Sequence, residues 1–146
     1  MFSGIQQLVQ QFAGHADAGT AHQVPHQEAY QAYDTMQQQM TPEQIGQAAQ
    51  RYYEQASPEQ RAQMAQQYQQ GFGQYNDTQS QQYAQIDPNH ATPQQLGEMH
   101  QQAAQSHPDM LHQLLSPGGA LGGTGSKLAV AGIAAFAAKQ LLGGGS

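Results

Sequence analysis

The chain of 146 residues contains no cysteine and no tryptophan, and only four of its residues are lysine or arginine. Without cysteine, the chain can form neither a disulfide bond nor a thiolate site. Nucleic-acid binding needs a cationic surface that releases counterions, and a chain with a net charge of −6 offers no such surface. These absences exclude cysteine chemistry and argue strongly against a nucleic-acid partner.

Bulky apolar residues are also scarce. Leucine, isoleucine, valine and phenylalanine together number 20, about 14% of the chain. A share below roughly 20% is typical of disordered chains when the net charge is high, but here the net charge is small. Tyrosine (7 residues) and methionine (6 residues) partly replace the missing side chains. We therefore expect a thin core of marginal stability, and a protein partner or homo-oligomer that stabilises it.

Glutamine is the most abundant residue, with 32 copies. Glutamine is a fair helix former, but glutamine-rich tracts can also aggregate through their polar side chains. In this chain the glutamines alternate with apolar residues at helical spacing and are interrupted by prolines. This pattern favours soluble helices over aggregation.

Several helix starts share one capping pattern. Thr41–Gln44 (TPEQ) and Ser57–Gln60 (SPEQ) place a hydroxyl at the cap, proline at the first helical position and glutamine at the third. In a capping box, the hydroxyl accepts from a backbone N–H and the glutamine reaches back to the cap. The pattern returns at Thr92–Gln95 and, more weakly, at His107–Asp109. Four helices are therefore predicted to begin at these positions.

These starts outline two helical hairpins, Thr41–Phe72 and Thr92–Leu115. The pair Ile45-Gly46 of the first hairpin recurs as Leu96-Gly97 in the second, 51 residues later. Tandem hairpins of this size normally bury their apolar faces against each other. We predict an internal duplication; chance recurrence in a glutamine- and alanine-rich chain is the alternative.

An amphipathic helix is predicted near the N-terminus, at Ser3–Ala13. Its apolar residues follow helical spacing, and they are Ile5, Leu8, Val9 and Phe12. We expect it to dock on the body of the protein or on another subunit. A membrane-surface anchor is the alternative, weakened because no lysine or arginine accompanies the stripe. Gly14–Val24 is predicted to be a linker, Pro25–Gln39 a helix, and Thr78–Ile86 a short helix.

The segment Leu128–Ala138 (LAVAGIAAFAA) carries no polar side chain. As a helix it is apolar on all faces, so protein or lipid must cover it. Three interpretations are open: a central core helix, an oligomerisation or docking helix, and shallow insertion in a membrane with Lys127 and Lys139 at the surface. The glycine-rich segment Gly118–Ser126 favours a separable tail. The candidate interaction residues are Leu128, Val130, Ala131, Gly132, Ile133, Ala135, Phe136, Leu141 and Leu142.

No catalytic motif is present. Three of the seven histidines, His100, His107 and His112, could converge across the second hairpin, and they are the weak candidates for a metal site. Their spacing matches no zinc pattern, and no cysteine assists them. Many of the carboxylates stand at helix starts, where they stabilise the helix dipole. We therefore predict no enzyme activity, no metal and no cofactor.

Three phrases resemble those of small uncharacterised bacterial helical proteins rich in glutamine and alanine. They are the MFxxI start, SPEQRAQM at Ser57–Met64, and the C-terminus rich in glycine, alanine and leucine. The resemblance implies a small bacterial helical protein and implies no activity and no site.

Together these patterns predict an all-α fold, a small bundle of two tandem hairpins with an N-terminal amphipathic helix and an apolar C-terminal helix. The predicted units are 1–24, 25–116 and 117–146, the last being the glycine hinge and apolar helix. The predicted function is a non-enzymatic interaction or scaffold protein that self-associates or docks through the apolar helix. A small-molecule or metal-binding module and a membrane-surface protein are the alternatives. The N-terminus lacks the features of a secretory signal, so the expected location is cytoplasmic, with peripheral contact at a membrane as a variant.

Overall fold

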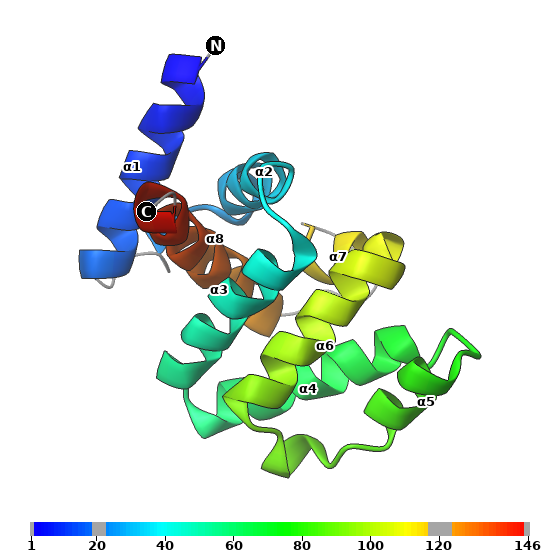
Figure 1. Cartoon of the computed structure of the whole chain (residues 1–146). Coiled ribbons are helices and arrows are strands. Elements are labelled where there is room, and N and C mark those ends of the chain that lie inside the picture. The colour runs from blue at the N-terminus through cyan, green and yellow to red at the C-terminus, as the bar shows by residue number, and fades with distance from the viewer. Residues whose placement is uncertain (1, 19–22, 117–123, 145–146) are drawn as a thin grey trace.

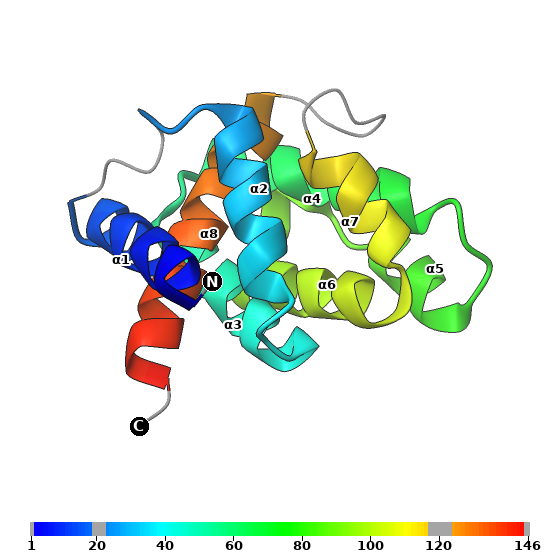
Figure 2. The same cartoon turned by 90° about the horizontal axis from the view of Figure 1, so that it is seen from above.

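A computed structural model describes residues 2–18, 23–116 and 124–144 of the chain. Within these ranges all regular structure is helical and no strand occurs, which confirms the predicted all-α bundle (Figures 1 and 2). The elements in chain order are α1 (Phe2–Ala18), α2 (His26–Gln37), α3 (Pro42–Gln55), α4 (Pro58–Phe72), α5 (Thr78–Ala84), the 3₁₀ helix η2 (Pro88–His90), α6 (Pro93–Ser106), α7 (Pro108–Leu115) and α8 (Thr124–Gly144).

Helices α3 and α6 begin with the predicted capping boxes. Thr41 Oγ1 accepts from the backbone N–H of Gln44 at 3.1 Å, and the Gln44 side chain accepts from the Thr41 N–H at 2.9 Å. Thr92 and Gln95 exchange the same two hydrogen bonds, at 3.1 and 3.0 Å. Each box satisfies two backbone donors that a helix start otherwise leaves without a partner.

The starts of α4 and α7 are simpler than the sequence predicts. Ser57 Oγ accepts from the backbone N–H of Gln60 at 3.1 Å. The side chain of Gln60 does not return to the cap, because its amide donates to Tyr52 Oη on the preceding helix. His107 precedes Pro108 and makes no side-chain cap bond with α7. At α4, a contact with Tyr52 thus replaces the second hydrogen bond of the capping box.

Removal of a capping hydroxyl tests these helix starts. Thr41→Ala and Thr92→Ala are each expected to lower the free energy of unfolding by about 1 kcal/mol, because each strips one helix of its N-cap acceptor. Thr35→Ala is the matched control, since Thr35 Oγ1 donates to the Gln31 carbonyl inside α2 and caps nothing. Urea unfolding followed by circular dichroism measures all three. Equal losses for Thr41→Ala and Thr35→Ala would contradict the role of the box.

Helices α3 and α6 cross at two glycines, Gly46 and Gly97. A Cβ atom at Gly46 would lie 2.7 Å from Gln101 Cβ, and one at Gly97 would lie 2.8 Å from Gln50 Cβ. The two contacts are reciprocal, and both glycines allow the backbones to approach closely. The second helices of the hairpins differ, since α4 has 15 residues and α7 has 8. Duplication of the hairpin stays a prediction.

Helix α8 lies within the bundle, against α1, α2 and α3 (Figure 1, orange to red). The view from above shows α1 and α2 on either side of its length (Figure 2). From Ala129 to Ala138 every residue is buried except the half-buried Phe136. A helix that is apolar on all faces therefore has protein on nearly all of them.

Two helices are longer than the sequence predicts. Helix α8 begins at Thr124, inside the predicted glycine hinge, and Ser126 lies within the helix, where its hydroxyl donates to Gln67 of α4 at 3.0 Å. Helix α1 runs through Gly14 to Ala18, so the first part of the predicted linker is helical. The remainder of that linker at 19–22, and residues 117–123 of the hinge, lie outside the described residues.

Tyrosine, methionine and alanine supply much of the core. The largest fully buried side chains are Phe12, Met36, Ile45, Tyr53, Met64, Tyr68, Phe72, Leu96, Met99, Met110, Leu114 and Leu115. Six alanines of α8 are at most 1% exposed, which brings the surrounding helices close to its backbone. This agrees with the expectation that large flexible and aromatic side chains replace aliphatic ones.

Candidate functional site

Most of the candidate interaction residues of α8 are buried by the chain itself. Val130 and Ile133 are 0% exposed, and Ala131 and Ala135 are 1% exposed. Gly132 faces Tyr52, and a Cβ there would lie 2.1 Å from its ring. While α8 stays in the bundle these residues reach no partner. The structure therefore corresponds to the core-helix interpretation, with α8 packed against α1, α2 and α3.

The exceptions lie at the margins of α8. Leu128, Phe136 and Leu141 are half-buried, and Leu142 is 54% exposed. Leu142 is the one large hydrophobic side chain in the exposed class among the residues whose side chains are described. None of the helices in the described part of the chain is long and apolar enough to cross a membrane.

A groove of about 400 Å³ surrounds Leu142. Its lining comes from α1, from the turn after α2 and from the last turns of α8, and it consists of Gln6, Val9, Gln10, Gln39, Leu141 and Leu142. We call this surface the α1–α8 groove. Its described lining has three aliphatic side chains and three glutamines, and none of these residues is charged.

A buried hydrogen-bonded chain lies elsewhere in the core, around His100. Tyr33 Oη is 2.8 Å from His100 Nε2, and Tyr68 Oη is 2.6 Å from His100 Nδ1. Tyr68 is joined in turn to Tyr53, with 3.0 Å between the two hydroxyl oxygens. All four side chains are at most 4% exposed. We call these residues the Tyr–His chain.

Burial dictates the protonation of the Tyr–His chain. Desolvation lowers the pKa of His100 to about 3, because no carboxylate compensates an imidazolium there. Desolvation likewise raises the pKa of Tyr33, Tyr53 and Tyr68. A neutral imidazole has one N–H and one lone pair, so one tyrosine accepts from the ring and the other donates to it. His100 therefore has no ring nitrogen left for a metal.

A second polar cluster joins Asp77, Ser80 and His107, the residue types of a hydrolase triad. His107 Nε2 lies 3.0 Å from Asp77 Oδ1 and 3.3 Å from Ser80 Oγ. A triad uses the two different ring nitrogens for the carboxylate and the hydroxyl. Here both partners share Nε2, and the Ser80 hydroxyl donates to Asp77 at 2.8 Å. Since Ser80 is also 0% exposed, the cluster has the geometry of a structural connection and not that of a nucleophile with its base.

The same cluster anchors the start of α5. Asp77 accepts from the Ser80 N–H at 3.0 Å as the N-cap. This backbone bond, the Ser80 hydroxyl and His107 together hold the pKa of Asp77 below its ordinary value. The His107 ring stacks on Tyr75, with 3.7 Å between centroids. His107 thus fastens the α6–α7 junction to α5.

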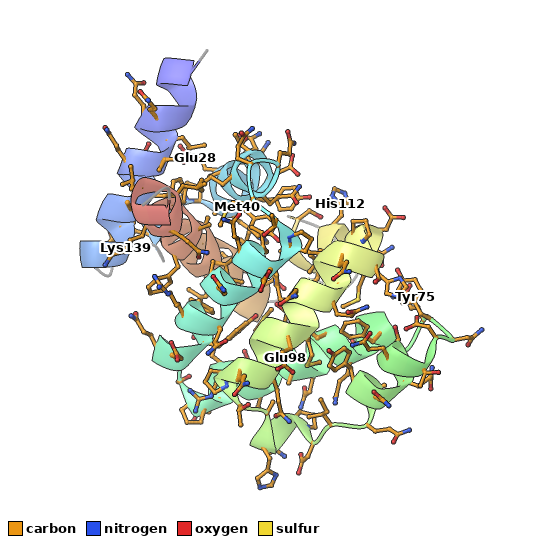
Figure 3. The ribbon with its side chains drawn as sticks, in the orientation of Figure 1. Glu28, Met40, Tyr75, Glu98, His112 and Lys139 are labelled. Carbon is orange, nitrogen blue, oxygen red and sulfur yellow. The ribbon has the colours of Figure 1, made fainter. Side chains whose placement is uncertain are left out.

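The third candidate histidine, His112, faces α2. Its Nδ1 is 2.6 Å from Tyr30 Oη, and the two rings meet edge to face with 5.6 Å between centroids. Figure 3 labels His112 on α7. His100, His107 and His112 therefore contact three different sets of neighbours and do not converge. Among the described residues, no group of three or more His, Asp or Glu side chains is placed to hold a metal ion.

A pocket of about 250 Å³ adjoins His112, between α2 and α7. Tyr30, Tyr33 and Asp34 of α2 line the pocket together with Asp109 and His112 of α7. Burial, and the negative charge of Asp34, raise the pKa of Tyr30. The pocket thus combines carboxylates with aromatic rings. Helical spacing alone predicts Tyr30 and Tyr33 as packing residues and does not show that α7 lies opposite them.

Family models, curated proteins and solved structures offer no match to this chain. The resemblance to small bacterial helical proteins rich in glutamine and alanine therefore stays a prediction.

Proposed function

We propose that this chain is a non-enzymatic helical interaction protein that self-associates through the α1–α8 groove. The observation that carries the proposal is Leu142, which is 54% exposed at the edge of an apolar groove. Exposed apolar side chains that gather at a hollow are typical of contact surfaces. The docking role predicted for the C-terminal helix is thereby confined to its last turns.

The composition of the α1–α8 groove supports a second copy as the partner. In a two-fold dimer the same patch occurs on both sides, so any charge in it would face a like charge nearby. None of the described residues that line this groove is charged, although the chain has a net charge of −6. It also contains both a projecting side chain, Leu142, and a hollow beside Val9 and Leu141 that can receive one. The patch is therefore complementary to itself.

The engagement of the polar side chains supports the non-enzymatic part of the proposal. The imidazole of His100 is bonded at both nitrogens inside the core, and His107 is shared between Asp77 and Ser80. A general base needs a nitrogen within reach of a substrate proton. His100 offers no such nitrogen, and the Nε2 of His107 is occupied by Asp77 and Ser80.

Leu142→Glu tests the proposal. Self-association is expected to weaken by at least about tenfold, because the change removes the projecting side chain and sets two carboxylates close together across the two-fold axis. A patch this small is expected to give a dissociation constant on the order of 0.1 mM. Sedimentation velocity over a range of concentrations around that value measures the monomer–dimer equilibrium of the full chain.

Gln63→Glu is the matched control, because it adds the same charge at an exposed position of α4 that does not line the groove. Its self-association is expected to equal that of the unaltered chain. A chain that stays monomeric up to millimolar concentration contradicts the proposal. So does a dimer that Leu142→Glu leaves intact.

A further inference from the structure

The pocket between α2 and α7 has the chemistry of a cation site. Asp34 of α2 and Asp109 of α7 both line it, so that each of the two helices contributes one carboxylate. The carboxylate of Asp34 accepts hydrogen bonds from the side-chain amides of Gln37 at 3.2 Å and Gln38 at 3.4 Å. Both donors are neutral, so these bonds orient the carboxylate and leave its charge in place.

No basic side chain in the described part of the chain forms an ion pair with either carboxylate. His90 pairs with Asp87, and His107 pairs with Asp77. Arg61, one of four lysines and arginines, donates to the backbone carbonyls of Tyr53 and Ala56 instead. The negative charge of the pocket is therefore open to compensation from outside the chain.

Aromatic rings form the wall beside the carboxylates. Tyr30 stacks on Tyr33 with 6.4 Å between centroids and meets His112 edge to face at 5.6 Å. Its hydroxyl is held by His112 Nδ1 at 2.6 Å, which fixes the ring in place. A fixed aromatic ring attracts a cation through its negative face, and the attraction grows where water is displaced.

The apolar residues that line the rest of the pocket favour an organic cation over an inorganic one. Leu111, Ala104 and Pro108 also line the pocket, and they suit methylene groups better than a hydrated ion. The described residues contain no ligand set of three for a metal ion. A volume of about 250 Å³ is small for a ligand pocket, since pockets for drug-sized ligands measure about 300 Å³ or more. The ligand must therefore be small, positively charged and partly aliphatic.

We propose that the pocket formed by Tyr30, Asp34, Asp109 and His112 binds a small organic cation, an alkylamine in its ammonium form. The ammonium group lies between the two carboxylates, and the methylene chain packs on Tyr30 and Leu111. Neither the groove nor Leu142 takes part, so this inference is independent of the proposed self-association.

The test is an amide NMR titration of the full-length chain with the linear diamine putrescine. Saturable shift changes are expected at residues of α2 and α7 around the pocket, with a dissociation constant in the millimolar range. Asp34→Asn and Asp109→Asn are each expected to weaken binding by about tenfold, since each removes one charge and keeps the side-chain shape. Butanediol, which has the same length without charge, is expected to cause no saturable change.

Glu98→Gln supplies the control for general attraction to an acidic protein. Glu98 is exposed on α6 and lies well apart from His112 (Figure 3). Its replacement changes the net charge as Asp34→Asn does, and putrescine binding is expected to stay unchanged. The proposal is overturned if Glu98→Gln weakens binding as much as Asp34→Asn, if butanediol binds equally well, or if shift changes spread over the whole acidic surface. Circular dichroism of each variant verifies that the fold is intact.

Discussion

Replacing Gly132 by alanine is expected to lower the free energy of unfolding by about 2 to 3 kcal/mol, because a single methyl group overfills this position. A Cβ there would lie 2.1 Å from Cδ1 and 2.3 Å from Cε1 of Tyr52. The obstacle is a rigid ring whose hydroxyl accepts a hydrogen bond from Gln60 and whose edge packs on Tyr53 at 5.0 Å. Helix α8 must therefore move away from α3 and lose contacts along its length.

Gly14→Ala is expected to change the free energy of unfolding in the opposite direction. Gly14 lies inside α1, and a Cβ there would meet nothing within 4 Å. Alanine is favoured over glycine in a helix by about 1 kcal/mol, so Gly14→Ala is expected to stabilise the chain by up to that amount. Thermal unfolding at fixed protein concentration compares the two variants. Gly132→Ala is expected to lower Tm by roughly 6 to 12 °C, and Gly14→Ala to raise it slightly.

Comparing Gly132→Ala with Gly14→Ala also separates two roles for α8, that of a core helix and that of a helix at a subunit interface. If Gly132 lay at an interface between subunits, alanine there would change the oligomeric state and leave the fold of the monomer intact. In the core, the same change lowers stability at every concentration. A Gly132→Ala variant as stable as the unaltered chain would contradict the core position of α8 in solution.

The sequence predicts the helix starts because each depends on a few neighbouring residues. Thr41 and Thr92 form capping boxes in the structure as their TPEQ and TPQQ patterns indicate. Ser57 has the same pattern, yet its Gln60 bonds to Tyr52, eight residues away on another helix. A local pattern predicts which bonds are available, and packing decides which of them form.

Local sequence patterns do not predict the position of α8. An amphipathic helix shows by its apolar stripe which face is covered, whereas Leu128–Ala138 is apolar on every face. Its sequence therefore requires cover without indicating whether this chain, a partner or lipid provides it. The glycines before it favour a separable tail in the sequence, but the structure extends α8 back to Thr124 and packs it against α1, α2 and α3.

The polar contacts of the histidines depend on tertiary packing in the same way. Tyr33 and His100 are separated by 67 residues, and Tyr68 and His100 by 32. Helical spacing places these residues on buried faces but does not show which faces meet. The second hairpin suggests that His100, His107 and His112 converge, and the structure gives each of them a different set of side-chain partners. The sequence does contain one signal for the contacts of His100. A histidine on the apolar stripe of a predicted helix needs a buried hydrogen-bond partner, and the apolar stripes of this chain contain tyrosine as such a partner.

Acidification below pH 6.5 is expected to destabilise the fold steeply through His100. Burial in the Tyr–His chain lowers the pKa of this side chain from 6.5 to about 3. Between these values the unfolded chain binds a proton at His100 and the folded chain does not. Stability is therefore greatest above pH 6.5 and falls as the pH falls, by about 1.4 kcal/mol per unit and by about 4 to 5 kcal/mol in total at pH 3.

His100→Gln isolates this contribution, because glutamine keeps one donor and one acceptor and does not titrate. We expect the variant to be less stable at neutral pH by about 1 to 3 kcal/mol, since its bonds to Tyr33 and Tyr68 have poorer geometry. The difference from the unaltered chain is expected to shrink as the pH falls below 6.5. Carboxylates such as Asp77, whose pKa is lowered in the fold, affect both proteins equally and cancel in the difference.

Tyr33→Phe distinguishes titration from the loss of a hydrogen bond. The variant removes the hydroxyl next to His100 Nε2, so it is expected to lose about 1 to 2 kcal/mol at neutral pH. Because His100 remains buried without a charged partner, its stability is expected to fall with pH in parallel with that of the unaltered chain. Urea unfolding from pH 7 to pH 4 measures all three proteins. If the stability of His100→Gln also falls with pH in parallel with that of the unaltered chain, burial of a neutral His100 is not the source of the acid sensitivity.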